Sequence, residues 1–338
     1  MLIGFRRPLM LYSVAETLGV GMRVSDRVLK CALFLGVMDD KRFVPVGTAF
    51  IVQHQEEEYF YQYIVTCQHN VISAGTRPLH IRVNEKSGGA EVSEEIQPDA
   101  WLYHPDSAKR FVDIAVMPAT LPIDVFDIAH IVSKDLWSRE KIAERDIGVG
   151  EELFYPGLFL HHSGAARNLP VMRSGTLAAM PIEPVETARG PTTAYLMESR
   201  SIGGHSGSPV FANLLAPRSY YADKVLPLPL PHEDQRYPML GVLRSYFKTV
   251  DEGLSSNAAS DDLSLNSGIS TIIPSWEITD ILNQPKQVEM RKRLNAELRA
   301  SRTAEVEASA VPATDNPSHK EDFTRLLGAA VQAKSQAE

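Results

Sequence analysis

SIGGHSGSPVF, residues Ser201–Phe211, places three glycines and three serines around one histidine, directly before an apolar segment. Glycine and serine are common turn residues, so the simplest interpretation is a turn that leads into a strand. A second interpretation is that the glycines around Ser206 bend the backbone sharply and leave room for a substrate carbonyl, so that the serine is a nucleophile. That interpretation requires a histidine to accept the hydroxyl proton and a carboxylate to orient the histidine.

Two other segments supply these groups. In YIVTCQHNVI (63–72) an apolar strand ends and His69 follows it, and in RFVDIAVMPA (110–119) Asp113 begins an apolar strand. A carboxylate there is partly buried and needs a partner, which His69 can provide. The sequence therefore predicts His69 as the base, Asp113 as the orienting acid and Ser206 as the nucleophile. The structural alternatives are a strand-end histidine, a capping carboxylate and an ordinary turn serine.

The chain between about residues 28 and 274 has the pattern of a β protein. Short runs rich in Val, Ile, Phe and Tyr recur there between Gly, Pro and Asp residues. Many short strands with irregular loops favour a barrel or a sandwich over alternating strands and helices. The runs are VLKCALFLGV, VPVGTAFIV, YFYQYIVTC, LHIRV, DIAVMPA, MRSGTLAAM, TAYLMES, SPVFANLL, MLGVLRSYF and GISTIIP.

The three chemical segments resemble the His, Asp and Ser motifs of the trypsin-like (chymotrypsin-fold) serine peptidases, particularly the disulfide-free bacterial branch that includes the HtrA/DegP-type proteases. VTCQHNV is similar to the family's Thr-Ala-x-His segment, VDIAVM to Asp-Ile-Ala-Leu, and GHSGSPVF to Gly-x-Ser-Gly-Gly-Pro. VGTAFIV resembles the Gly-Thr-Gly-Phe strand that precedes the histidine. The order and the gaps also agree with the family, over roughly residues 28–283.

The resemblance implies an all-β fold of two orthogonal six-stranded β-barrels, with a C-terminal helix and a partly disordered tail. It implies a serine endopeptidase that acts on a peptide or protein substrate without a cofactor. The oxyanion hole is expected from the backbone N–H groups of Gly204 and Ser206.

The resemblance also suggests substrate-binding residues. NSGISTIIP matches the last barrel strand, against which these enzymes pair the substrate backbone, so Ser267 and Gly268 are candidates. Arg200 stands six residues before the nucleophile, where the family has the base of its primary specificity pocket, and Ser201 lies beside it. A guanidinium there favours an acidic substrate side chain. The alternative is that Arg200 is a surface charge.

The sequence departs from the family pattern at three positions. Ser208 replaces the second glycine after the nucleophile, and Ala49 replaces a glycine in the strand before the histidine. His205 stands where the digestive enzymes have an aspartate that pairs with a processed N-terminus. His205 therefore argues against zymogen activation of that kind, and none of the three changes removes a group needed for acyl transfer.

The predicted organisation is an N-terminal extension (1–27), a peptidase domain (28–285) whose two barrels meet near 120–150, and a tail (286–338). SWEITDILNQ predicts a helix after Pro274, with Ser275 as its cap. From about residue 289 we expect a helix, then a disordered linker around SAVPATDNPSHK and an amphipathic helix in EDFTRLLGAAVQAK. The tail is a candidate for partner binding or self-association, with a simple solvated tail as the alternative.

Composition excludes several classes of function. A net charge of −8 without a basic stripe argues against a nucleic-acid binder, and no apolar run approaches the roughly 18 residues of a membrane span. The histidines lack metal-ligand spacing, so no metal is predicted. Cys31 and Cys67 are the only cysteines, which excludes a disulfide framework and favours the cytoplasm. Cys67 is expected to be a core residue rather than a redox switch.

Secretion is not favoured, because polar residues interrupt the apolar start of the chain, and Met22 is an alternative start site. Two other functions stay open. One is a catalytically silent relative that binds peptides or partners. The other is an α/β-hydrolase, which needs Gly-x-Ser-x-Gly and an acid and histidine after the serine; Ser208 and the Pro-rich surroundings of His232 argue against it.

Overall fold

The structure is a computed structural model that describes residues 24–187, 189–199, 203–214, 237–249 and 265–310. The chain divides into two compact units, Met1–Gln284 and Pro285–Glu338. Helix α6 (Pro285–Ala310) is the described part of the second unit. The linker and the amphipathic helix predicted after it lie almost entirely outside the described residues.

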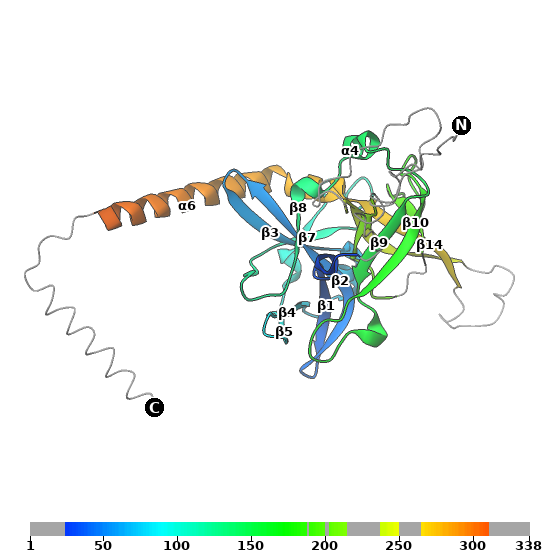
Figure 1. The fold of residues 1–338 in the computed structure, drawn as a ribbon, viewed down its shortest axis with the longest axis horizontal. Helices are drawn as coiled ribbons and strands as arrows, with labels where there is room; N and C mark the ends of the chain where they lie inside the picture. Colours follow the sequence, from blue (N-terminus) through cyan, green and yellow to red (C-terminus); the bar gives the residue numbers. More distant parts are fainter. Residues whose placement is uncertain (1–23, 188, 200–202, 215–236, 250–264, 311–338) are drawn as a thin grey trace, which may run out of the picture. The chain divides into compact units, whose positions relative to one another are not determined.

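The N-terminal half of the first unit is an eight-stranded sheet in the order β5-β4-β1-β2-β3-β7-β6, with β8 paired in parallel to β2 (Figure 1). Between its edge strands β5 and β6 the described residues form no ladder. Its strands are β1 (Ala32–Asp39), β2 (Arg42–Glu56), β3 (Tyr59–Thr66), β4 (His80–Asn84), β5 (Ala90–Val92), β6 (Leu102–Tyr103), β7 (Ala115–Ala119) and β8 (His130–Val132).

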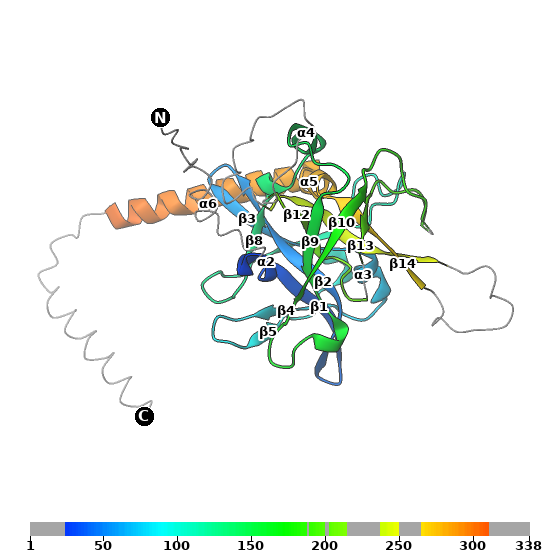
Figure 2. The ribbon, with the colours of Figure 1, turned by 45° about the vertical axis from the view of Figure 1, so that its right-hand side comes forward.

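The C-terminal half is a closed barrel in the order β10-β11-β14-β13-β12-β9 (Figure 2). All of its neighbouring strands are antiparallel. Its strands are β9 (Glu152–Gly157), β10 (Val171–Ala179), β11 (Tyr195–Glu198), β12 (Pro209–Ala212), β13 (Met239–Thr249) and β14 (Leu265–Pro274).

The two halves share a buried apolar interface. Successive residues of β2 point to opposite faces, because side chains alternate along a strand. Ala49 and Ile51 therefore pack inside the N-terminal sheet, whereas Phe50 and Val52 pack in a cluster that also contains Phe154 of the barrel. The shared cluster places the ends of β3 and β7 opposite the loop before β12, which is where the candidate site lies.

Short helices connect the strands. They are α2 (Asp26–Leu29), α3 (Gln68–Ser73), α4 (Arg139–Glu144) and α5 (Trp276–Leu282), with 3₁₀ turns at Pro98–Ala100, Ser133–Asp135 and Leu160–His162. Ser275 precedes α5 as predicted, but its hydroxyl does not cap the helix. It donates instead to the carbonyl of Trp137 at 3.0 Å, which ties α5 to the segment before α4.

The predicted all-β fold class is confirmed, and each of the ten predicted runs contains a strand. The first half differs from a six-stranded barrel because short strands extend the sheet at its edges. Four strands, β5, β6, β8 and β9, were not predicted from the sequence. In the described part of the chain, no helix is both long and apolar enough to span a membrane.

Candidate functional site

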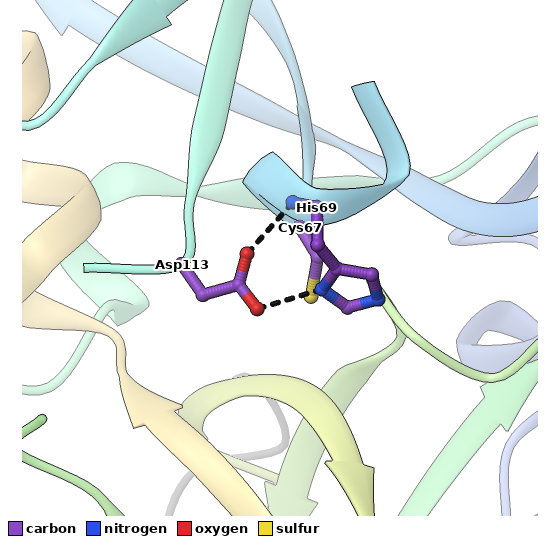
Figure 3. Close-up of side chains that lie close together, drawn as sticks. All are labelled: Cys67, His69 and Asp113. Atoms are coloured by element: carbon purple, nitrogen blue, oxygen red, sulfur yellow. Dashed lines mark hydrogen bonds and ion pairs between the residues drawn. The ribbon is translucent and has the colours of Figure 1, made fainter. Parts of the chain in front are cut away.

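His69 and Asp113 are joined by two hydrogen bonds where β3 ends and β7 begins in the N-terminal sheet (Figure 3). His69 lies in the first turn of α3, directly after β3 ends, and Asp113 lies two residues before β7. Nδ1 of His69 is 2.6 Å from Oδ2 of Asp113, and the backbone N–H of His69 donates to Oδ1 at 2.8 Å. Because the carboxylate accepts the proton on Nδ1, the neutral ring leaves Nε2 free to accept another proton.

The Asp113 carboxyl is buried and ionised at neutral pH. Its side chain is 1% exposed, and burial alone raises the pKa of a carboxyl group. The hydrogen bonds and charge of His69, together with the charge of Arg244, act in the opposite direction and bring the pKa of Asp113 below its usual value. The carboxylate is therefore available to orient and stabilise the imidazole.

Arg244 is a third member of this cluster, and the sequence analysis did not identify it. Its Nε donates to Oδ2 of Asp113 at 3.0 Å, and its guanidinium lies 5.1 Å from the ring centroid of Phe111. The signal was present in the sequence, since Arg244 is a charged residue directly after the apolar run MLGVL of β13.

The loop that carries Ser206 is anchored to the N-terminal half by its backbone. The Ser206 carbonyl accepts hydrogen bonds from the Thr48 N–H at 3.0 Å and from Nδ2 of Asn70 at 2.8 Å. Gly207 has a φ of +92°, and a Cβ there would lie 2.0 Å from the Thr48 carbonyl oxygen. Only glycine fits this close approach, which explains one glycine of the motif.

The Ser206 hydroxyl donates to the backbone carbonyl of Arg244 at 2.5 Å. In the described part of the chain, no hydrogen bond joins it to His69. Arg244 nevertheless contacts both Ser206 and Asp113, so the three predicted residues gather around one residue of β13.

The backbone beside Ser206 has unused donors. Among the described residues, none accepts a hydrogen bond from the backbone N–H of Gly204 or of Ser206. The Gly204 carbonyl is held by Oγ1 of Thr48 at 2.8 Å, and this oxygen also accepts the Leu158 N–H at 2.9 Å. Thr48 therefore fixes the loop, while both predicted oxyanion-hole donors have no acceptor among the described residues.

The predicted substrate-binding residues are only partly described. Arg200 and Ser201 lie outside the described residues. Ser267 and Gly268 lie in β14, and the Gly268 carbonyl accepts the Ser199 N–H at 2.7 Å. A Cβ on Gly268 would meet no atom within 4 Å, so this part of the strand borders open space.

Cys67 is buried beside the pair, and its thiol donates to the Leu243 carbonyl at 3.2 Å. Burial, and then the charge of Asp113, raise the pKa of this thiol well above its usual value. A neutral, hydrogen-bonded thiol is a packing group rather than a nucleophile, in line with the predicted core role. Potential ligand atoms of Cys67, His69 and Asp113 lie within 4.8 Å of one another, but Asp113 already binds Arg244.

A second cluster of potential ligands lies away from this site. Atoms of His104, Glu277 and Asp280 also lie within 4.8 Å of one another, a proximity that the spacing in the sequence does not reveal. Arg110 donates to both oxygens of Glu277, at 2.9 and 2.6 Å. The Arg110 guanidinium thus already compensates the negative charge of the Glu277 carboxylate.

The departures from the motif have local explanations. Ser208 is fully buried and faces Gly157 of β9, where a Cβ would lie 2.2 Å from Oγ of Ser208. A glycine in the neighbouring strand thus makes room for the serine that replaces a glycine in the motif. His205 is also buried, and its ring packs edge-on against Tyr155 at 5.6 Å between centroids.

No protein-family model matches the sequence, and no curated protein matches it. The solved structures that are similar to this chain include the following two. The MamO protease domain from Magnetospirillum magneticum is 13% identical, with 76% of this chain and 98% of that chain covered and a TM-score of 0.46. Deg5 is 12% identical, with 75% and 88% covered and a TM-score of 0.42. At these low identities, the similarity does not assign a role to any residue of this chain.

The fold of the chain is therefore assigned from its own strand order. A closed β-barrel packs against a second β-sheet, and segments from both halves meet at the ends of β3, β7 and the loop before β12. A closed antiparallel barrel packed against a second β-sheet is the architecture that the predicted chymotrypsin-like fold requires.

Proposed function

We propose that the protein is a serine endopeptidase in which His69 is the general base, Asp113 orients it and Ser206 is the nucleophile. The observation that carries the proposal is the double hydrogen bond between His69 and the buried Asp113 carboxylate. A surface histidine needs no such support, whereas a base that must alternate between neutral and charged forms does.

The reaction follows from these groups. Oγ of Ser206 attacks the carbonyl carbon of the scissile peptide while Nε2 of His69 accepts the hydroxyl proton. The carbonyl oxygen becomes an oxyanion, and the unpaired N–H groups of Gly204 and Ser206 stabilise it. His69 then donates the proton to the leaving amine, which leaves an acyl ester on Ser206. A water molecule then attacks this ester while His69 accepts its proton. His69 returns that proton to Oγ of Ser206 as the ester C–O bond breaks and the peptide acid is released.

The substrate is a peptide or protein segment, and its side-chain preference is a finer part of the proposal. If Arg200 lies at the base of the primary pocket, an acidic side chain before the scissile bond is preferred. The cytoplasmic location and the association of the tail with a partner stay predictions from the sequence.

A catalytically silent binding protein is the second candidate, and one observation favours it. The Ser206 hydroxyl donates to the Arg244 carbonyl rather than to His69. Catalysis requires this side chain to rotate about its Cα–Cβ bond until the hydroxyl meets Nε2. A protein that never makes this rotation would bind peptides beside Ser206 without cleaving them.

Labelling of the intact protein with a fluorophosphonate separates the two candidates, because only an activated serine reacts. We expect wild-type protein to be labelled and to cleave peptides, and Ser206→Ala to remain folded but to lose about 10⁴- to 10⁶-fold in turnover. Ser208→Ala, two residues along the same loop, is the matched control and should still be labelled. A folded wild-type protein that resists labelling, or peptide cleavage by Ser206→Ala at the wild-type rate, contradicts the proposal.

A further inference from the structure

Arg244 places a positive charge directly against the acid of the candidate site. Its Nε lies 3.0 Å from Oδ2 of Asp113, and the same oxygen accepts the proton on Nδ1 of His69 at 2.6 Å. The Arg244 side chain is 12% exposed and the Asp113 side chain 1%, so water screens this contact poorly. One carboxylate oxygen is therefore shared between a permanent cation and a ring that becomes a cation during catalysis.

The packing around Phe111 keeps the guanidinium in place. The Arg244 guanidinium lies 5.1 Å from the Phe111 ring centroid, and the ring is two residues before Asp113 in the chain. A guanidinium over an aromatic face is attracted by the ring's quadrupole, which adds to the ion pair. The side chain is thus held at both its Nε and its planar face.

The charges that face His69 come from few groups. Among the described residues, Asp113 is the negative group bonded to His69 and Arg244 of β13 is the positive group bonded to Asp113. The neighbouring Cys67 thiol is neutral, because burial and the Asp113 charge raise its pKa. Arg189 is a further cation near this cluster, and its guanidinium lies 5.5 Å from the centroid of the same Phe111 ring. Arg244 is the cation that touches the carboxylate.

We propose that Arg244 is a positioning residue that sets the pH range of the His69–Asp113 pair. The positive charge of Arg244 partly offsets the negative charge of Asp113. The carboxylate therefore stabilises a protonated His69 less strongly. His69 then remains neutral, and able to accept the Ser206 proton, at lower pH than it would beside an unpaired aspartate. This inference rests on the proposed peptidase function and goes beyond it, because the triad logic itself assigns no role to a cation here.

The test changes the charge of residue 244 in variants that remain folded and compares their pH profiles. We expect R244Q to raise the midpoint of the pH–rate profile for fluorophosphonate labelling by about one pH unit. R244K keeps the charge and should restore the midpoint to near the wild-type value. R189Q removes the other guanidinium on Phe111 and is the matched control, with an unchanged midpoint. A purely structural role of Arg244 would lower the rate at every pH and leave the midpoint in place.

A second readout separates this inference from the peptidase proposal. The ring C–H resonances of His69, assigned with His69→Gln, can be followed against pH by NMR whether or not the protein cleaves anything. The titration midpoint should again rise in R244Q and return in R244K. If R244Q does not fold, R244M is measured in its place. Equal midpoints in wild-type and R244Q, or equally shifted ones in R244Q and R244K, overturn the role of the charge; an unlabelled wild-type protein overturns the peptidase function alone.

Discussion

At the scale of the residue, the loop around Ser206 shows how a motif accommodates a changed position. Ser208 is fully buried against Gly157, and its hydroxyl has no hydrogen-bond partner among the described residues. A buried hydroxyl without a partner has lost its bonds to water and gained none in return. The Ser208 side chain therefore fits the space beside Gly157, but among the described residues its hydroxyl forms no hydrogen bond there.

This contact predicts the sign of a stability change. We expect Ser208→Ala to raise the free energy of unfolding by about 1 kcal/mol, because it removes the unpaired hydroxyl and keeps the Cβ. Ser199→Ala is the matched control in the same half of the protein, since the Ser199 hydroxyl is bonded to that of Tyr155 at 2.8 Å. That variant should lose about 1 kcal/mol. Urea denaturation measures both, and a loss of stability in both variants would show that the Ser208 hydroxyl is satisfied.

At the scale of the element, α5 is joined to the N-terminal half by a buried ionic cluster. Both oxygens of Glu277 accept hydrogen bonds from Arg110, and Nε2 of His104 lies 3.2 Å from Oε2 of Glu277. The side chains of Glu277 and His104 are each 1% exposed. Removing Glu277 deletes the acceptor of two Arg110 hydrogen bonds, and the Arg110 side chain is only 31% exposed, so water replaces these bonds incompletely.

We therefore expect Glu277→Ala to lower the free energy of unfolding by about 2–4 kcal/mol in urea denaturation. Asp280→Ala is the control on the same helix. Its carboxylate is 3.6 Å from Nε2 of His104 but is 54% exposed, so the expected loss is below about 1 kcal/mol. Similar losses in the two variants would mean that the buried cluster does not set the cost, because alanine itself favours a helix more than either acid does.

The elements also show how far the sequence could be interpreted. His69, Asp113 and Ser206 were predictable because a short motif surrounds each one, and the ten apolar runs were predictable from their composition. β9 was missed because Pro156 and Gly157 interrupt its apolar run. The contacts of Arg244 with Asp113 and of Arg110 with Glu277 join residues 131 and 167 positions apart. No short sequence pattern around either residue indicates such a contact.

At the scale of the whole molecule, an ionised acid, Asp113, adjoins the apolar cluster that the two halves share. Val112 and Ile114 belong to the apolar cluster that both halves share, and Asp113 lies between them in the chain. The carboxylate is compensated by His69 and Arg244, from α3 and β13. The stability of the interface should therefore depend on the protonation of this one group.

The contribution of the Asp113 carboxylate to the free energy of unfolding should decrease in acid. The pKa of Asp113 is lower in the folded protein than its usual value, so its contribution to stability is present above the pKa of an unfolded aspartate, about 3.9, and is lost as pH falls through the lower folded value. Asp113→Asn removes this contribution at every pH. We expect the variant to be about 2–4 kcal/mol less stable than wild type at pH 7, because Arg244 is left without its partner.

The difference in unfolding free energy between wild type and Asp113→Asn should then narrow as the pH falls from 5 to 2, measured by urea denaturation at each pH. Asp127→Asn is the control for an ordinary surface acid. The pKa of Asp127 is also lowered, first by the hydrogen bond from Lys30, but its side chain is 24% exposed and that of Lys30 47%. Its difference from wild type should stay below about 1 kcal/mol throughout. A gap for Asp113→Asn that stays constant or widens in acid would show that the carboxylate is not ionised in the folded protein, and the orienting role of Asp113 would fail with it.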